Sequence, residues 1–212
     1  MRQRKVKNEE EKLQVYSNLL AKTPAMNKGR WRENFGNNND IYVEIGCGKG
    51  QFITTLAREN PDRNYIGIEG RGSVILRALE KTVESKCSNI IFINEFVNDV
   101  EEVFGQNELS GIYLNFSDPW PKDRHAKRRL IHTRYLEGYR NILRPEHFIE
   151  FKTDNNDLFQ FALDEFEKNK MTVVECTENL HGTELPAKNI TTEYEDKFKV
   201  SGKSINYCKV II

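Results

Sequence analysis

The sequence predicts an α/β fold with a mostly parallel central sheet, helices on both of its faces and an antiparallel pair of strands at its C-terminal edge. From residue 41 onward, short apolar runs alternate with segments of helical periodicity, as in folds whose parallel strands are joined by helical crossovers. Three closely spaced glycines follow the first apolar run, where such folds turn tightly into a helix. The last two strand-like runs have no convincing helix between them, which favours antiparallel pairing.

The composition describes a folded chain of one main domain. Of its 212 residues, 38% are hydrophobic and 30% are charged, which excludes wholesale disorder. Lys and Arg number 32, as do Asp and Glu, so any contact with a nucleic acid must depend on how the charge is distributed. The four cysteines include no C-x-x-C pair and fit neither a zinc site nor a disulfide framework. We expect a reduced, cytoplasmic protein without a membrane span or signal peptide, because no apolar stretch reaches the necessary length and none follows the basic N-terminus.

The first 40 residues predict an appendage to the main domain. Residues 1–8 contain four basic side chains and no acidic one, and we expect a mobile basic tail there. Behind three glutamates, Leu13, Tyr16 and Leu20 recur at helical spacing, which predicts a short amphipathic helix. Glycine, proline and asparagine in residues 23–40 predict a connecting segment. We therefore divide the chain into residues 1–40 and a main domain of residues 41–212.

Strands are predicted where short apolar runs lie between turn signals. Five belong to the alternating part of the chain and two close it, over residues 41–45, 65–68, 90–93, 112–116, 148–151, 171–176 and 204–212. Helices are predicted from near Gln51, over residues 74–83 and from near Asn155. Right-handed crossovers through these helices would make the first five strands largely parallel.

The loop after the first strand holds Gly46, Gly48 and Gly50. Glycines at such a turn let the backbone bend sharply and approach a cofactor closely. Because Gln51 stands at the sixth position, the loop does not match the G-x-G-x-x-G/A pattern of dinucleotide-binding proteins, and no P-loop sequence is present. An ordinary glycine turn between strand and helix is the alternative interpretation.

Two acidic residues strengthen the case for a cofactor. Glu44 lies within the first strand, and Glu69 ends the second strand, where doubly wound folds place a carboxylate that accepts from ribose hydroxyls. An acid beside the glycines would repel a pyrophosphate but suits a cofactor that carries an ammonium and a sulfonium, such as S-adenosylmethionine. The alternatives are that Glu69 is a solvated strand end and that Glu44 orients the loop.

The segment after the fourth strand carries the strongest signal. Asp118 follows the strand, and two prolines stiffen the backbone around Trp120, as suits a catalytic loop. Residues 122–129 then hold five Lys or Arg against one acid. Such a cluster beside a cofactor edge predicts a polyanionic substrate, although a solvated start of a basic helix would give the same pattern. Trp120 fits either a core residue or a platform for a base.

These motifs resemble those of a known family. The string N-F-S-D-P-W-P-K-x-R-H-x-K-R-R, with E-I-G-C-G-K-G before it and F-K-T-D-N and T-E-Y-E after it, is similar to the bacterial tRNA (guanine-N7)-methyltransferases over nearly the whole chain. The resemblance implies a Rossmann-like class I fold. It further implies that S-adenosylmethionine is the methyl donor, S-adenosylhomocysteine the product, and N7 of guanine 46 in the tRNA variable loop the acceptor. A monomer and a homodimer are both compatible with it, and no DNA partner is expected.

The resemblance also implies roles for individual residues. Asp118 is the active-site acid and lies close to the cofactor. The other cofactor residues are Glu44, Gly46, Gly48, Gly50, Glu69 and Phe96. The substrate residues are Lys122, Asp154, Thr192, Glu193, Tyr194 and Glu195, with Arg124, His125, Lys127, Arg128 and Arg129 as the RNA-contacting run.

Two of these assignments keep an alternative. Phe96 stands where the family often has an acid near the adenine, so it would stack or offer backbone groups while Asn98 or Asp99 supplies a polar contact. Asp154 would either contact the substrate or cap the helix beginning near Asn155. The histidines offer no metal-ligand spacing, and we expect no metal site.

The chemistry and two rival functions complete the sequence-based interpretation. Guanine N7 carries a free lone pair, so methyl transfer needs positioning and stabilisation of the developing charge, which we assign to Asp118. A small-molecule methyltransferase would explain the glycine loop and its acids but not the basic run. A non-catalytic RNA-binding module would explain the basic run but not Glu44 and Glu69.

Overall fold

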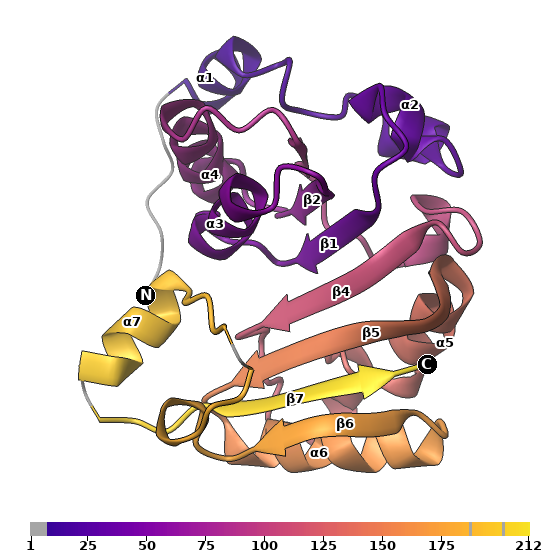
Figure 1. Ribbon diagram of the computed structural model, residues 1–212, viewed down its shortest axis with the longest axis vertical. Helices are drawn as coiled ribbons and strands as arrows, with labels where there is room; N and C mark the ends of the chain where they lie inside the picture. Colours follow the sequence, from indigo (N-terminus) through magenta and orange to yellow (C-terminus); the bar gives the residue numbers. More distant parts are fainter. Residues whose placement is uncertain (1–7, 187, 201) are drawn as a thin grey trace.

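A computed structural model of the chain describes residues 8–186, 188–200 and 202–212. Its seven strands form one sheet in the order β3-β2-β1-β4-β5-β7-β6 (Figure 1). The strands are β1 (Ile41–Ile45), β2 (Asn64–Ile68), β3 (Ile90–Ile93), β4 (Leu109–Asn115), β5 (Leu143–Thr153), β6 (Thr172–Thr177) and β7 (Asn206–Ile211). The first five pair in parallel, and β7 pairs antiparallel with both β5 and β6. The predicted sheet, including its antiparallel C-terminal pair, is confirmed.

Helices join the strands and cover both faces of the sheet. The α-helices are α1 (Glu9–Val15), α2 (Trp31–Phe35), α3 (Gln51–Glu59), α4 (Gly72–Glu84), α5 (Thr133–Ile142), α6 (Asn156–Lys168) and α7 (Glu193–Val200). Short 3-10 helices span η1 (Pro24–Asn27), η2 (Val100–Glu102), η3 (Asp123–Arg128) and η4 (Leu180–Gly182). Within the described ranges, no helix combines the length and apolar character needed to cross a membrane.

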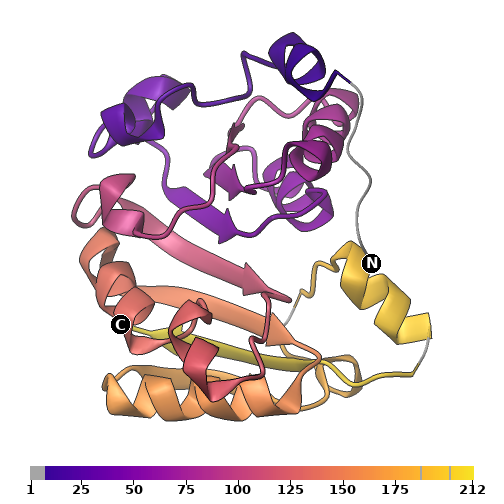
Figure 2. The same cartoon turned by 180° about the vertical axis from the view of Figure 1, so that it is seen from behind.

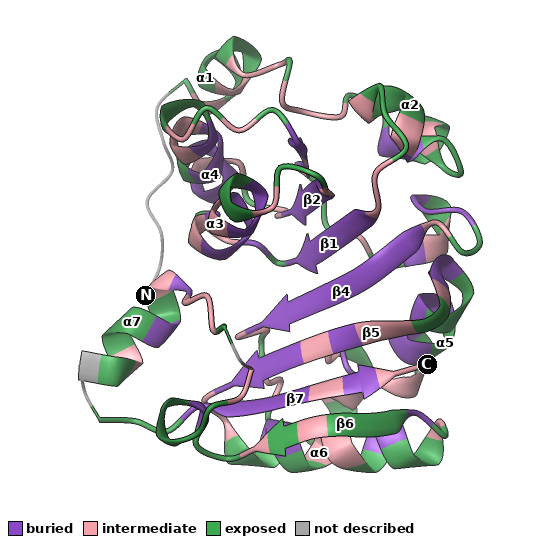
Figure 3. Cartoon of the chain, viewed as in Figure 1, coloured by how far each residue is buried: buried purple, intermediate pink, exposed green. Residues whose placement is uncertain are grey.

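The core consists of two layers separated by the sheet. Residues of α3 and α4 pack with Tyr42, Tyr65 and Phe92 on one side, whereas residues of α5 and α6 pack with Val43 and other sheet residues on the opposite side. Every residue of β1 and β4 is buried, as Figure 3 shows, because a central parallel strand is covered on both faces. The buried middle of the sheet therefore fixes the positions from which the strand ends emerge.

Residues 8–40 pack against the main domain. The α1 helix contacts α4, and Leu20 forms a parallel bridge to Phe92 on β3. The Trp31 side chain is fully buried and donates from Nε1 to the Val103 carbonyl over 2.9 Å. A short helix is present where predicted, but it spans only Glu9–Val15, so Tyr16 and Leu20 of the predicted pattern lie beyond its end. The division at residue 40 stays a prediction, and the basic side chains of residues 1–7 lie outside the described residues.

Three local expectations were wrong or incomplete. The α7 helix occupies part of the segment between β6 and β7, where no helix was expected, and α5 follows the basic run without having been anticipated. The α7 helix is only eight residues long and highly charged, so it has a weak amphipathic pattern. Asn155, not Asp154, caps α6, because its side chain accepts from the Leu158 amide over 2.7 Å.

Candidate active site

The functional residues gather where the parallel strands end. The arrowheads of β1, β4 and β5 point toward the side of the molecule on which α7 lies, in both Figure 1 and Figure 2. Glu44, Glu69, Asp118 and Asp154 lie at or just beyond the ends of β1, β2, β4 and β5, respectively. In open parallel sheets, ligands bind outside these carboxyl ends, so the arrangement defines a candidate site at this edge.

The glycine loop is tied to the neighbouring strand and leaves open space. The amides of Gly46 and Cys47 both donate to the Ile68 carbonyl, over 2.8 and 2.9 Å. Gly46, Gly48 and Gly50 have φ angles of +83°, +57° and +78°, which L side chains rarely adopt. A Cβ at Gly46 or Gly48 would meet no atom within 4 Å, whereas one at Gly50 would lie 2.5 Å from Ala78 Cβ. The first two glycines thus serve the turn, and the third also allows α3 to pack against α4.

Glu44 is a buried carboxylate with one partner. Asn115, the last residue of β4, donates from Nδ2 to Glu44 Oε1 over 2.8 Å. Glu44 Oε2 and Asn115 Oδ1 are buried and have no hydrogen-bond partner among the described residues. Burial raises the pKa of Glu44 to about 8, an effect that the Asn115 hydrogen bond reduces and the charge of Glu193 increases. The Lys152 charge and the Ile53 amide also favour the ionised form, but Oε2 itself has no hydrogen-bond partner among the described residues.

Glu69 is partly buried at the turn after β2. Its Oε1 accepts from the Arg71 amide over 2.9 Å, and its own carbonyl accepts from Asn94 Nδ2 over 2.9 Å. Burial raises the pKa of Glu69, the Arg71 amide opposes this rise, and the negative charge of Asp118 contributes to it. The structure thus brings Glu69 and Asp118 into electrostatic contact, as their shared position at the sheet edge predicts.

Phe96 lies against the same turn. Its side chain is 70% exposed, and a Cβ at Gly70 would come within 2.5 Å of the ring. The exposed ring is placed where a flat group beside Glu69 could stack on it.

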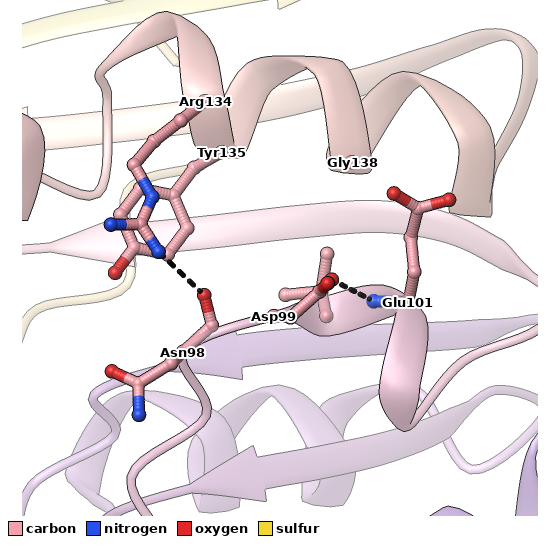
Figure 4. A pocket seen from close by; sticks show the side chains of 7 residues that line it. Asn98, Asp99, Glu101, Arg134, Tyr135 and Gly138 are labelled. Carbon is pink, nitrogen blue, oxygen red and sulfur yellow. Dashed lines mark hydrogen bonds between the residues drawn. The ribbon is translucent and has the colours of Figure 1, made fainter.

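Asn98 and Asp99 border a pocket of about 180 Å³ that also touches Arg134 on α5 (Figure 4). Asp99 Oδ1 accepts from the Glu101 amide over 2.9 Å and caps η2, while the Asn98 carbonyl accepts from Arg134 over 3.5 Å. The Asn98 side chain points away from Arg134 in Figure 4. The Asp99 side chain is thus used to cap η2, whereas only the backbone carbonyl of Asn98 is used. Of the two residues considered for an adenine contact, Asn98 is therefore the one whose side chain takes no part in these two hydrogen bonds.

The Asp118 loop has an unusual backbone. Phe116 and Trp120 have positive φ angles of 51° and 42°, which aromatic residues rarely adopt. Arg129 stabilises this shape by donating to the carbonyls of Pro119 and Trp120, each over 3.1 Å. Its guanidinium also lies 4.3 Å from the centre of the Phe161 ring on α6. Asp118 is exposed between these anchored positions.

The basic run is mostly exposed, and some of its side chains also contact protein groups. Lys122, Arg124, Lys127 and Arg128 are exposed around η3. Arg128 lies over the Trp120 ring at 4.9 Å, and His125 meets the same ring edge-on at 5.7 Å. Trp120 is thus partly exposed and contacts two side chains of the run, so it is not a core residue. Three residues of the run, His125, Arg128 and Arg129, therefore contact other groups of the protein.

The downstream residues are similarly divided. Asp154 pairs with Lys203, and Glu193 pairs with Lys81 on α4. Tyr194 is 59% exposed and stacks against Phe116, with 6.2 Å between ring centres. Thr192 is buried at the start of α7, where its hydroxyl accepts from the Glu195 amide over 3.0 Å.

Glu195 is fully buried and surrounded by protein partners. Its Oε2 lies 3.3 Å from Lys152 Nζ, and its Oε1 accepts from Asn189 Nδ2 and lies 3.6 Å from His181 Nε2. Of the four residues 192–195, only Tyr194 presents an exposed side chain at the site edge.

Several contributing residues had no assigned role at the sequence level. Asn115 and Lys152 lie within motifs already noted, but only the pairing of β4 with β1 and the fold of residues 189–195 show what they contact. Gln51 and Lys81 reach α7 through Asp196 and Glu193. The one signal in the sequence is a lysine at the end of a predicted buried strand, because lysine is rarely buried without a partner.

The site fits S-adenosylmethionine on the chemistry of its donors. A buried carboxylate with a free oxygen suits the ammonium of the methionine part, and the open space over Gly46 and Gly48 admits a ligand close to the backbone. Glu69, at the end of the second strand, suits ribose hydroxyls. The fold and this site define an S-adenosylmethionine-dependent methyltransferase.

Sequence comparisons give the family. Residues 38–208 match the family model described as a putative methyltransferase. A tRNA (guanine-N(7)-)-methyltransferase of Brevibacillus brevis is 44% identical over 205 residues, covering 97% of this chain and 95% of the relative. The protein of the same name from Lachnoclostridium phytofermentans is 48% identical over 183 residues, covering 86% of each chain. The chain belongs to the tRNA (guanine-N(7)-)-methyltransferase family.

Solved structures share the fold. The 16S rRNA methyltransferase KamB matches with a TM-score of 0.60 at 12% identity, over 86% of this chain and 93% of that chain. A SAM-dependent methyltransferase from Aquifex aeolicus matches with a TM-score of 0.56 at 12% identity, over 98% of this chain and all of that chain. At these identities the likeness concerns the Rossmann-like fold alone.

Proposed function

We propose that this protein transfers the methyl group of S-adenosylmethionine to N7 of guanine 46 in the tRNA variable loop, giving 7-methylguanosine. The observation that carries the proposal is the Asp118 loop, where an exposed acid beside Glu69 is followed at once by exposed basic side chains. A chain with equal numbers of acidic and basic residues has concentrated positive charge next to the candidate cofactor edge. This combination suits a small cationic cofactor and a large polyanionic substrate.

The residues at the sheet edge divide the work of holding the cofactor. Glu44 would pair with the ammonium, Glu69 would accept from the ribose hydroxyls, and the Phe96 ring would cover the adenine side. The glycine loop provides room for the methionine part of the ligand. When bound, S-adenosylmethionine supplies an electrophilic methyl group and leaves as S-adenosylhomocysteine.

Asp118 acts on the guanine. N7 has a lone pair and no proton, so no general base is needed to create the nucleophile. The protein must hold N7 in line with the methyl carbon, about 3 to 3.5 Å away. Methylation places positive charge on the purine, and the Asp118 carboxylate stabilises that charge and accepts a hydrogen bond from the base edge. The arginine-supported backbone around Pro119 and Trp120 keeps this carboxylate in place.

The exposed basic residues bind the RNA backbone. Lys122, Arg124 and Lys127 neutralise phosphates without reading sequence, which makes binding steeply dependent on salt. Tyr194 offers an exposed aromatic face for an extruded base beside Phe116. Such an enzyme works where tRNA is made and used, so we also propose that it is cytoplasmic.

Two measurements on the purified protein test this proposal against its rivals. Calorimetry should detect binding of S-adenosylmethionine, and methyl transfer to unmodified tRNA should fall steeply as salt is raised. Cofactor binding with salt-insensitive methylation of a low-molecular-weight acceptor would instead favour a small-molecule methyltransferase. RNA binding without cofactor binding would favour a non-catalytic RNA-binding module.

A further inference from the structure

Lys152 is a buried lysine near the carboxyl end of β5. It is 1% exposed, so its side chain is almost completely shielded from solvent. Nζ donates to the Ile190 carbonyl over 2.9 Å and to Asn189 Oδ1, and it lies 3.3 Å from Glu195 Oε2. All three acceptors belong to residues 189–196, which we call the strap. A single buried charge therefore holds three points of one short segment.

The strap also reaches the other half of the sheet. Gln51, the first residue of α3, donates to Asp196 Oδ2 over 2.6 Å, and Lys81 on α4 pairs with Glu193. Since α3 follows the glycine loop directly, the strap runs from β5 to the helices beside the candidate cofactor edge of the sheet. Figure 1 shows its helix, α7, beside the carboxyl ends of the strands.

This course places Tyr194 next to the Asp118 loop. The Tyr194 ring stacks on Phe116, which precedes Asp118 by two residues and has a positive φ angle. The two residues flanking Tyr194 both point to protein partners, since Glu193 pairs with Lys81 and Glu195 is fully buried against Lys152. The exposed side chain of Tyr194 is thus set by the anchors on either side of it.

We propose that Lys152 and Glu195 form a buried ion pair that positions the strap over the active-site edge, and that Glu195 is a positioning residue and not a ligand of the tRNA. The part of the test that measures kcat rests on the proposed function, because it requires methylation of tRNA. A buried pair of this kind adds little net stability, but removing one partner leaves an uncompensated charge in the interior. Burial lowers the pKa of Lys152, and Glu195, with Glu150 and Glu44 further away, opposes that change.

The test compares Lys152→Met, Glu195→Gln and the double variant. We expect each single change to increase hydrogen exchange of the strap amides and to lower kcat by about a hundredfold, since small displacements at a reacting centre have effects of that size. The double variant should lose no more activity than the worse single variant, because both changes break the same contact. Salt dependence of tRNA binding should match wild type, because neither residue contacts phosphate.

A pair on the same sheet provides the matched control. Lys209 on β7 lies 3.6 Å from Glu150 on β5, and neither has a hydrogen bond or ion pair to the strap among the contacts found in the described residues. The double variant Lys209→Met/Glu150→Gln removes both charges of this pair and so leaves the net charge near Lys152 unchanged; it should leave both strap exchange and kcat close to wild type. If Lys152→Met does not fold, Asn189→Ala removes a partner of both charges without creating an unpaired one.

Three results would overturn the inference. One is unchanged strap exchange in Lys152→Met or, where that variant does not fold, in Asn189→Ala; another is normal kcat with a loosened strap. The third is additive losses in the double variant, which would indicate independent roles, including a direct contact of Glu195 with RNA. If the wild-type protein were inactive on tRNA, the proposed function would be wrong. The exchange measurement would still test whether the Lys152–Glu195 pair holds the strap in place.

Discussion

Asn115 Nδ2 donates to Glu44 Oε1 over 2.8 Å, while Oε2 of the same buried carboxylate has no hydrogen-bond partner among the described residues. The two residues meet because β4 pairs with β1 at the centre of the sheet. Asn115 thereby fixes the orientation of the carboxylate and leaves one oxygen for a ligand. The unpaired oxygen identifies the point at which the ammonium of the cofactor would compensate a buried negative charge.

The first prediction concerns the pH dependence of stability. The pKa of Glu44 rises from its ordinary value of 4.5 to about 8 in the folded chain, so the native state binds an extra proton between these values. Stability contributed by the protonated carboxyl is fully present at low pH and is lost as pH rises through that window. Glu44→Gln should therefore gain stability relative to wild type as pH rises, with the gain levelling off above about pH 8.

Chemical denaturation across this range measures the difference between the two proteins. Saturating S-adenosylhomocysteine, which carries the same ammonium, should stabilise wild type and have a far smaller effect on Glu44→Gln. A pH-independent difference between the two proteins would contradict the assignment of the buried charge.

The second prediction isolates the role of Asp118. Because the side chain is exposed, Asp118→Asn should leave thermal stability close to wild type. Loss of the negative charge should lower kcat for tRNA methylation by about 100- to 1000-fold, the range seen when one preorganised electrostatic partner is removed. Single-turnover methyl transfer with saturating tRNA measures this effect. Near-normal turnover in Asp118→Asn would show that the carboxylate charge is not used.

The third prediction distinguishes two roles within the basic run: binding of RNA phosphates by Lys127 and support of the Asp118 loop by Arg129. Lys127 is exposed, so Lys127→Ala should weaken tRNA binding and reduce the slope of log affinity against log salt by about one. Arg129 holds the carbonyls of Pro119 and Trp120, so Arg129→Ala should lower kcat with little change in that slope.

Binding titrations at several salt concentrations, paired with kinetics, measure both quantities in parallel. Added guanidinium should partly restore turnover in Arg129→Ala and have no such effect in Lys127→Ala. Equal changes of slope in the two variants would instead make Arg129 an RNA contact.

The fourth prediction concerns Tyr194 as a stacking face. Its ring is 59% exposed and lies at 21° to the Phe116 ring, and the Lys197 ammonium is 5.7 Å from its centre; we expect a base to stack on the exposed part of the ring. Tyr194→Phe should retain most of the activity, whereas Tyr194→Ala should lose about 1 to 3 kcal/mol of substrate binding. The Michaelis constant for tRNA, compared between the two variants, reports the loss. Equal impairment of both variants would point to the hydroxyl and not to stacking.

The strands and the cofactor edge were predictable because their signals are local. Apolar runs and alternating helices determine which strand ends share an edge, and Glu44, Glu69 and Asp118 follow from their positions in that order. Strand bounds agreed to within a few residues for most elements. The largest difference is β5, which begins at Leu143, before Pro145 and several polar residues that conceal its start in the sequence.

The contacts that support the site were not predictable in the same way. Asn115 and Glu44 are 71 positions apart, and Lys152 and Glu195 are 43 positions apart, so neither pairing is visible without the fold. Arg129 resembles its exposed neighbours in charge, and only the fold shows that it donates to the carbonyls of Pro119 and Trp120. Five of the eight residues of α7 are charged, which concealed the helix in the sequence, and its position depends on the buried Glu195 and not on a strong apolar stripe.

The most direct test of the central claim is transfer of labelled methyl from S-adenosylmethionine to two unmodified tRNA transcripts. They are identical except that one has guanine and the other 7-deazaguanine at variable-loop position 46. The account predicts labelling of the first and none of the second, because the second has no nitrogen at the acceptor position. Equal labelling of both would contradict N7 of guanine 46 as the target, and labelling of neither would contradict methylation of tRNA by this chain.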